Sequence, residues 1–186
     1  MKVAMDWLPR DKITRQWRWG LPLVAAIIAL DQIAKGMVLG EPRFGAAECL
    51  TGASGCGGVV LVPPVFNQHP LFSLSMTWNH GVSFGALQSE GLARWALFAA
   101  TSLIAVGFTV WLLRAERWMT ALSLSLVIGG AVGNLVDRAR FGAVVDFLDF
   151  SGLYFPWIFN VADAAISVGA AFLLLDQLLA SRKPRV

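Results

Sequence analysis

The 186-residue sequence contains few of the residues on which most catalytic and metal sites depend. It has only two histidines, His69 and His80, and its two cysteines, Cys49 and Cys56, stand at no zinc-ligand spacing from them. A His-Glu-x-x-His segment is also absent, so the sequence disfavours a zinc hydrolase and predicts no metal or other cofactor. Charged residues make up only 15% of the chain and hydrophobic residues 56%. This balance excludes an ordinary soluble domain and indicates a polytopic membrane protein.

The cysteines lie in the Gly-rich segment CLTGASGCGG, which has the composition of a flexible loop. If this loop lies outside the cytoplasm, a disulfide between Cys49 and Cys56 is compatible with its surroundings. A thiol oxidoreductase is one alternative function, but the wide spacing of the cysteines and the lack of a second pair argue against it. Ser54 matches the GxSG of rhomboid-type serine peptidases only superficially, because it lies in this loop and not at a helix start.

Four apolar segments have the length of about 20 residues that is needed to cross a membrane. The sequence therefore predicts an all-α fold with four transmembrane helices in a single membrane domain, at residues 20–39, 93–113, 118–137 and 159–180. The runs VVLVPPVF and LFSLSMTW are rich in β-branched and aromatic residues and predict short strands at the membrane surface. The other parts are a tail at 1–19, a small β-rich platform at 40–92, a connecting segment at 138–158 and a tail at 181–186.

Basic residues set the predicted orientation. The two tails and the Arg114–Arg117 turn hold ten Lys and Arg, whereas the opposite side holds Arg43, Arg94, Arg138 and Arg140. By the positive-inside rule, both termini are cytoplasmic and the platform is extracytoplasmic. The net charge of +3 therefore orients the protein in a membrane and predicts no nucleic-acid partner.

Acidic residues at membrane depth are expensive and usually functional. Asp31 and Lys35 are four residues apart, so they share one helical face and are able to pair. We expect them to form a polar stripe inside the bundle, and an ion pair that reaches the outer interface is the alternative. Four further acids lie close together near the outer ends of the last two spans: Asp137, Asp146, Asp149 and Asp163.

The positions of these acids in the sequence predict different surroundings for them. Asp137 is adjacent to Arg138, and we expect it to hold the guanidinium or the helix end. The segment from Gly142 to Phe150 alternates, which predicts an extended chain with Asp146 and Asp149 on opposite faces. Asp146 has the more apolar neighbours, so it is the better candidate for a buried site.

The predicted helix at 118–137 carries a small-xxx-small pattern at Gly129, Gly130 and Gly133, which permits close approach of another helix. One turn further, Asn134 and Arg138 share a face. Arg138 is predicted to be a positive anchor near the interface, suited to a carbonyl or a lipid phosphate.

Asn160 and Asp163 are three residues apart at the start of the last span. Asn160 suits an N-cap, whereas an uninterrupted apolar helix follows Asp163 and places it below the interface. Two carboxylates brought together in a low-dielectric site share one proton, which supplies a base for water and an acid for a leaving amine. Asp146 and Asp163 are the predicted pair, although the GxGD of presenilin-type aspartic peptidases is absent.

A membrane transporter or proton channel is the alternative function, with Asp31, Lys35 and Asp163 as a relay. The sequence contains no internal repeat of the kind found in inverted-repeat transporters.

The polar motifs and their order resemble the lipoprotein signal peptidase family, also called signal peptidase II. The matching segments cover nearly the whole chain: Asp31-Gln-x-x-Lys35, Asn79-x-Gly-x-x-Phe-Gly85, Gly129-Gly-Ala-x-Gly-Asn-x-x-Asp-Arg138, Val144-Val-Asp-Phe147 and Phe159-Asn-x-Ala-Asp163. The stretch from Glu48 to Gly58 departs from the family pattern because it is longer than the usual loop.

This resemblance implies an intramembrane aspartic endopeptidase that removes the signal peptide from diacylglyceryl-modified prolipoproteins, just before the lipidated cysteine. It implies a multi-pass protein of the bacterial cytoplasmic (inner) membrane that acts at the extracytoplasmic face. Its partners would be prolipoproteins and membrane lipids, and we expect a monomer. The resemblance maps the catalytic aspartates to Asp146 and Asp163, with Asp137 as the second choice. Residues that line or support the substrate site map to Asp31, Lys35, Asn79, Asn134, Arg138 and Asn160.

Overall fold

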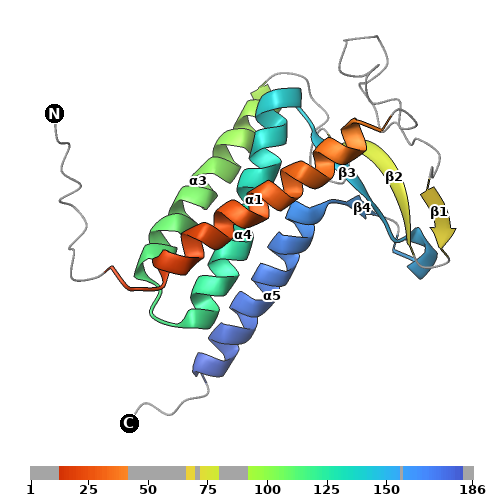
Figure 1. The fold of residues 1–186 in the computed structure, drawn as a ribbon. Helices are drawn as coiled ribbons and strands as arrows, with labels where there is room; N and C mark the ends of the chain where they lie inside the picture. The colour runs from red at the N-terminus through yellow and green to blue at the C-terminus, as the bar shows by residue number, and fades with distance from the viewer. Residues whose placement is uncertain (1–12, 42–65, 70–71, 80–91, 156, 182–186) are drawn as a thin grey trace.

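The computed structural model describes residues 13–41, 66–69, 72–79, 92–155 and 157–181 (Figure 1). Cys49 and Cys56, whose bonding the sequence left open, lie outside these residues with Ser54 and the long stretch from Glu48 to Gly58. The first predicted strand also lies outside them up to residue 65.

Four helices dominate the fold, and each is long and apolar enough to cross a membrane. They are α1 (Trp17–Leu39), α3 (Leu92–Arg114), α4 (Trp118–Phe141) and α5 (Val161–Ser181). This confirms the prediction of a helical membrane protein with four spans. The most apolar window of α4 is 61% buried, against 28% in α1 and 11% in both α3 and α5. Helix α4 is therefore the centre of the bundle, with the other three around it (Figure 1).

Glycines on α4 explain how closely its neighbours approach. A Cβ at Gly129 would lie 2.8 Å from Ile27 of α1, and one at Gly130 would collide with the backbone oxygen of Ala162 in α5. At Gly133 a Cβ would lie 2.7 Å from the Asp31 carboxylate. The small-residue pattern of α4 is therefore confirmed as a contact surface, and it faces both α1 and α5.

Helix α4 ends at Phe141, four residues beyond the predicted end at 137. Gly142 follows in the left-handed conformation, with φ of 76°, and its N–H donates to the Arg138 carbonyl at 3.1 Å. Glycine adopts this conformation without the steric penalty of a Cβ, so it terminates the helix here. The extra turn therefore contains Arg138 and Arg140, which lie on the helix beyond its apolar segment.

A four-stranded antiparallel sheet lies at one end of the bundle, beside the end of α1 and the start of α5 (Figure 1). Its strands, in spatial and chain order, are β1 (Phe66–His69), β2 (Phe72–Asn79), β3 (Val144–Asp149) and β4 (Ile158–Phe159). This confirms a small β-rich unit next to the helices.

The sheet has one apolar face, which packs on the bundle. Met76 and Trp78 of β2 cluster with Val145 and Phe147 of β3 and with Val38 of α1. Because side chains alternate along a strand, the opposite face of β2 and β3 carries polar residues, with Thr77 directly across from Asp146. The sheet thus holds Asp146 beside the helix ends.

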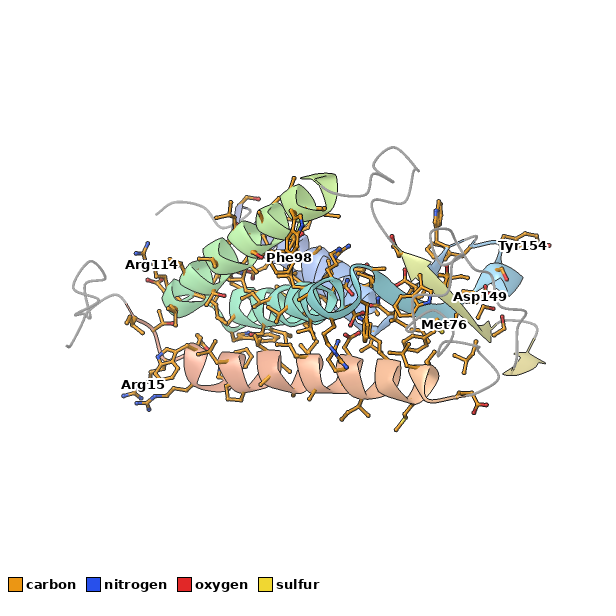
Figure 2. All side chains as sticks on the ribbon, turned by 90° about the horizontal axis from the view of Figure 1, so that it is seen from above. Arg15, Met76, Phe98, Arg114, Asp149 and Tyr154 are labelled. Atoms are coloured by element: carbon orange, nitrogen blue, oxygen red, sulfur yellow. The ribbon has the colours of Figure 1, made fainter. Side chains whose placement is uncertain are left out.

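At the other end of the molecule, polar contacts that were not predicted join α4 and α5. Asp176 of α5 is fully buried and accepts a hydrogen bond from the Thr120 hydroxyl at 2.5 Å. Its other carboxylate oxygen pairs with Arg117 at 2.6 Å. Figure 2 shows Arg15 and Arg114 at this end, far from Asp149 and Tyr154 beside the sheet. The molecule therefore has a basic end and a sheet end.

Candidate active site

The sheet end contains a cavity of about 900 Å³ that is lined by both predicted catalytic acids. Asp146 comes from β3 and Asp163 from the first turn of α5, and Asn79 and Arg138 lie on the same cavity. The rest of the lining is largely apolar: Leu97, Phe150, Leu153, Phe155, Trp157, Ile158, Phe159, Ala164, Ser167 and Val168. The cavity thus combines a few polar and charged side chains with a mostly apolar wall.

The start of α5 is fixed by a reciprocal cap between Asn160 and Asp163. The N–H of Asp163 donates to Asn160 Oδ1 at 2.9 Å, and the N–H of Asn160 donates to Asp163 Oδ2 at 3.3 Å. This is the geometry of a capping box, in which two unpaired N–H groups at a helix start are satisfied by each other's side chains. The N-cap interpretation of Asn160 is therefore correct, and Asp163 is both a capping residue and a cavity residue.

Side-chain amides hold the two acids in place. Asn160 Nδ2 donates to Asp146 Oδ1 at 2.7 Å, and Asn79 Nδ2 donates to Asp146 Oδ2 at 3.1 Å. Asn134 Nδ2 donates to Asp163 Oδ1 at 2.7 Å. With the capping bond, all four carboxylate oxygens of Asp146 and Asp163 accept a hydrogen bond from an N–H. We call this set of three asparagines and two aspartates the amide network.

The two acids of the amide network differ in burial, and Asp146 is only 2% exposed. Burial raises the pKa of Asp146 from its ordinary value of 3.8 to about 7, and the negative charge of Asp163 adds to the rise. Hydrogen bonds from Asn79 and Asn160 and the charge of Lys35 oppose it. Asp146 therefore keeps a proton at mildly acidic pH, which is the state required of a general acid.

Behind the amide network lies an ion cluster of Asp31, Lys35 and Asp137, all 2% exposed or less. Lys35 Nζ lies 2.8 Å from Asp31 Oδ2 and 2.7 Å from Asp137 Oδ2. The predicted pairing of Asp31 with Lys35 inside the bundle is confirmed. Asp137 was expected to hold the Arg138 guanidinium or the helix end. Its ion pair is with Lys35, whereas Arg138 lines the cavity.

The ion cluster also fixes the two chain segments that carry the acids. Asp31 Oδ1 accepts the N–H of Ala162 at 2.9 Å, at the start of α5. Asp137 Oδ2 accepts the N–H of Val145 at 3.2 Å, next to Asp146. Charged groups on α1 and α4 thereby hold the helix start and the strand at the same place.

Other predicted residues are turned elsewhere, and some contacts were missed. Asp149 accepts hydrogen bonds from the Ser75 hydroxyl at 2.8 Å and from the Ser151 N–H at 2.9 Å, away from the cavity lining. Gln32 was not predicted, yet its Nε2 bridges Asp137 at 2.9 Å and Asp31 at 3.2 Å. Its place in the motif Asp31-Gln-x-x-Lys35 was the signal that could have identified it. Among the described residues, no cluster of His, Cys, Asp and Glu has the arrangement of a metal site.

Comparisons with known proteins agree on one family. A sequence model described as Signal peptidase (SPase) II matches residues 23–179. Relatives named lipoprotein signal peptidase include that of Caulobacter vibrioides, which is 41% identical over 92% of this chain and 94% of its own length. Those of Methylobacterium radiotolerans and Brevibacillus brevis are 43% and 39% identical, over 87% and 90% of this chain and 86% and 99% of their own lengths.

A solved structure of a bacterial membrane enzyme shares the fold. It superimposes with a TM-score of 0.64, and the match covers 90% of this chain and 92% of the other. At 22% identity this likeness concerns the fold alone. The four helices able to span a membrane, together with the family match, support a multi-pass membrane protein. These findings support a peptidase and give no support to a transporter. The chain belongs to the signal peptidase II family of aspartic proteases, as its polar motifs predict.

Proposed function

We propose that this protein removes the signal peptide from diacylglyceryl-modified prolipoproteins and cleaves the peptide bond just before the lipidated cysteine. The observation that carries the proposal is the meeting of Asp146 and Asp163 on one cavity, held by the amide network. Family membership supports the substrate class, because the relatives are named for lipoprotein signal peptide removal.

The chemistry is that of an aspartic dyad with one shared proton. Asp146 holds the proton near neutral pH, and ionised Asp163 takes a proton from a water molecule. The water oxygen attacks the carbonyl carbon before the lipidated cysteine and forms a tetrahedral intermediate. Asp146 then donates its proton to the cysteine nitrogen and the C–N bond breaks, while Asp163 keeps the proton from the water, so the dyad again holds one proton. The products are the signal peptide with a new carboxyl group, which ionises in water, and a free amine on the cysteine.

The cavity provides suitable contacts for such a substrate. Arg138 and Asn79 line the cavity together with the two acids and are suited to bind carbonyl or phosphate oxygens. The apolar lining between Leu97 of α3 and Val168 of α5 suits acyl chains. Asn134 and Asn160 orient the two acids. Asp31 and Lys35 support the site from behind.

The orientation in the membrane is part of the proposal. The basic end of the molecule suits the cytoplasmic side, with both termini there, and the sheet end with its cavity suits the extracytoplasmic face. The bacterial inner membrane is the expected location, and the enzyme is expected to act as a monomer. Labelling of single cysteines introduced near residue 115 and near residue 154 tests this orientation in intact cells.

The decisive experiment is cleavage of a lipidated prolipoprotein in detergent by variants with one acid replaced. Asp146→Asn and Asp163→Asn are each expected to lose cleavage, measured by mass spectrometry of the released peptide. Asp149→Asn is the matched control, because it makes the same change on the same strand outside the cavity, and it should remain active. Full activity in either cavity variant contradicts the dyad. Ion or solute flux in liposomes without cleavage would support the transporter alternative.

A further inference from the structure

We propose that Lys35 is a positioning residue for the reaction: its ammonium group fixes the orientation of the Asn134 amide, and Asn134 in turn positions Asp163. This inference rests on the proposed function of Asp163. Lys35 itself does not line the cavity and is 2% exposed, so it acts through another residue and not on the substrate.

The ammonium group of Lys35 is fully used by three acceptors. Besides Asp31 and Asp137, Nζ donates to Asn134 Oδ1 at 3.1 Å. An ammonium group has three N–H donors, and each has one acceptor here. Two carboxylates from different helices hold the nitrogen in place, so the direction of the third N–H, toward Asn134, is set by the ion cluster.

This third bond determines which way the Asn134 amide faces. Its Oδ1 accepts from Lys35 and also from Asn160 Nδ2, at 3.1 Å in both cases. A reversed amide would place an NH₂ group against the ammonium and its oxygen against the carboxylate of Asp163. Because both contacts would be repulsive, only the observed orientation is favourable, with Nδ2 donating to Asp163 Oδ1 at 2.7 Å.

The consequence for catalysis is geometric. Asp163 has one oxygen bound by the capping N–H of Asn160 and the other by Asn134. If the Asn134 amide can turn, the second oxygen loses its donor and the carboxylate is free to rotate away from the position for proton abstraction. A misplacement of about 1 Å in a reacting group can reduce turnover about 100-fold.

A purely structural role for Lys35 has to be separated from this one. Lys35→Met alone leaves Asp31 and Asp137 buried without a cation, and loss of folded protein would then be expected. The test therefore uses the Asp137→Asn background, in which removal of Lys35 leaves one buried carboxylate fewer. The Asp137→Asn protein retains the contacts of Lys35 with Asp31 and Asn134 and is the reference.

The experiment is a double-mutant cycle on kcat in that background, with Lys35→Met, Asn134→Leu and the combination. Cleavage of a lipidated prolipoprotein is followed in detergent, and kcat, KM and the melting temperature are measured for each protein. We expect Lys35→Met to lower kcat about 100-fold with little change in KM. If Lys35 acts through Asn134, adding Lys35→Met to Asn134→Leu lowers kcat by less than about 2-fold, because coupled residues are not additive.

Gln32→Met is the matched control. Gln32 contacts the same two carboxylates as Lys35 but makes no hydrogen bond to Asn134. Measured in the same Asp137→Asn background, it should lower the melting temperature and reduce kcat much less than Lys35→Met does. The inference is overturned if the losses from Lys35→Met and Asn134→Leu multiply, or if Lys35→Met changes only KM or the melting temperature. Failure of the proposed function itself is distinct, because the unmodified protein would then not cleave the substrate.

Discussion

Replacement of Asp146 by Asn should make the protein inactive and, at alkaline pH, more stable than the wild type. Asp146 is buried beside a second acid, and its pKa lies at about 7 instead of 3.8. In the unfolded chain the carboxyl group is hydrated and ionises at its ordinary pKa. The folded state therefore keeps a proton that the unfolded state has already released, and raising the pH favours unfolding.

The size of this effect follows from the two pKa values. They differ by about 3 pH units, and each unit corresponds to about 1.36 kcal/mol, which gives at most about 4 kcal/mol. Because part of the rise comes from Asp163, the titration belongs to the pair, and we expect about 2–4 kcal/mol. The loss of stability begins near pH 4 and is complete above about pH 7. Asparagine does not ionise, so the variant escapes it.

Melting temperatures of both proteins in detergent, measured from pH 4 to pH 8, test this reasoning. The melting temperature of Asp146→Asn minus that of the wild type should increase by roughly 4–16 °C over this range. Constant effects of the substitution cancel in the comparison, because only the change with pH is used. If the difference in melting temperature stays constant or decreases with pH, the pKa of Asp146 is not raised in the folded protein.

Asp149→Asn provides a control with the opposite sign. Partial burial alone would raise the pKa of Asp149, but hydrogen bonds from the Ser151 N–H and the Ser75 hydroxyl outweigh it and lower the pKa. Its ionised form therefore contributes stability that is present at higher pH and lost as the pH falls. Relative to the wild type, this variant should become less stable as the pH rises.

Further substitutions test helix packing and buried polar contacts, by melting temperature and recovery of folded protein in detergent. Gly130→Val should destabilise the fold by about 1–3 kcal/mol or more, because the new side chain meets the backbone of Ala162. Gly36→Ala is the control and should be tolerated, because a Cβ at Gly36 meets nothing within 4 Å. Thr77→Val should stabilise the fold by about 1 kcal/mol, because the buried Thr77 hydroxyl has no hydrogen-bond partner among the described residues. Arg117→Met should destabilise the fold by about 3–5 kcal/mol, because it leaves the Asp176 carboxylate buried without its cation. Adding Asp176→Leu to this variant should restore most of the loss.

Local rules were enough to predict the spans and to separate two of the acids. Hydropathy and length located the four helices, and strand alternation placed Asp146 and Asp149 on different faces. Helical spacing likewise paired Asp31 with Lys35. Each of these inferences depends on residues within one element, where the backbone geometry fixes which side chains share a face.

Contacts between elements were harder to predict. Asp137 was expected to hold the Arg138 guanidinium or the helix end, because the two residues are adjacent, but neighbours on a helix point about 100° apart and do not face each other. Its true partner, Lys35, lies on another helix and is brought near by the close packing at Gly129 and Gly133. Gln32 was missed for the same reason, since the carboxylates it bridges come from two helices.

The central position of α4 also bears on how the sequence is free to change. A helix that faces lipid needs only apolar side chains, and many combinations satisfy that requirement. Helix α4 is surrounded by protein, and Gly129, Gly130, Gly133, Asn134 and Asp137 each meet a defined neighbour. Substitutions should therefore be tolerated along the lipid side of α3 and rejected along α4. A saturation library selected for cleavage should show this contrast as a map of the bundle's interior.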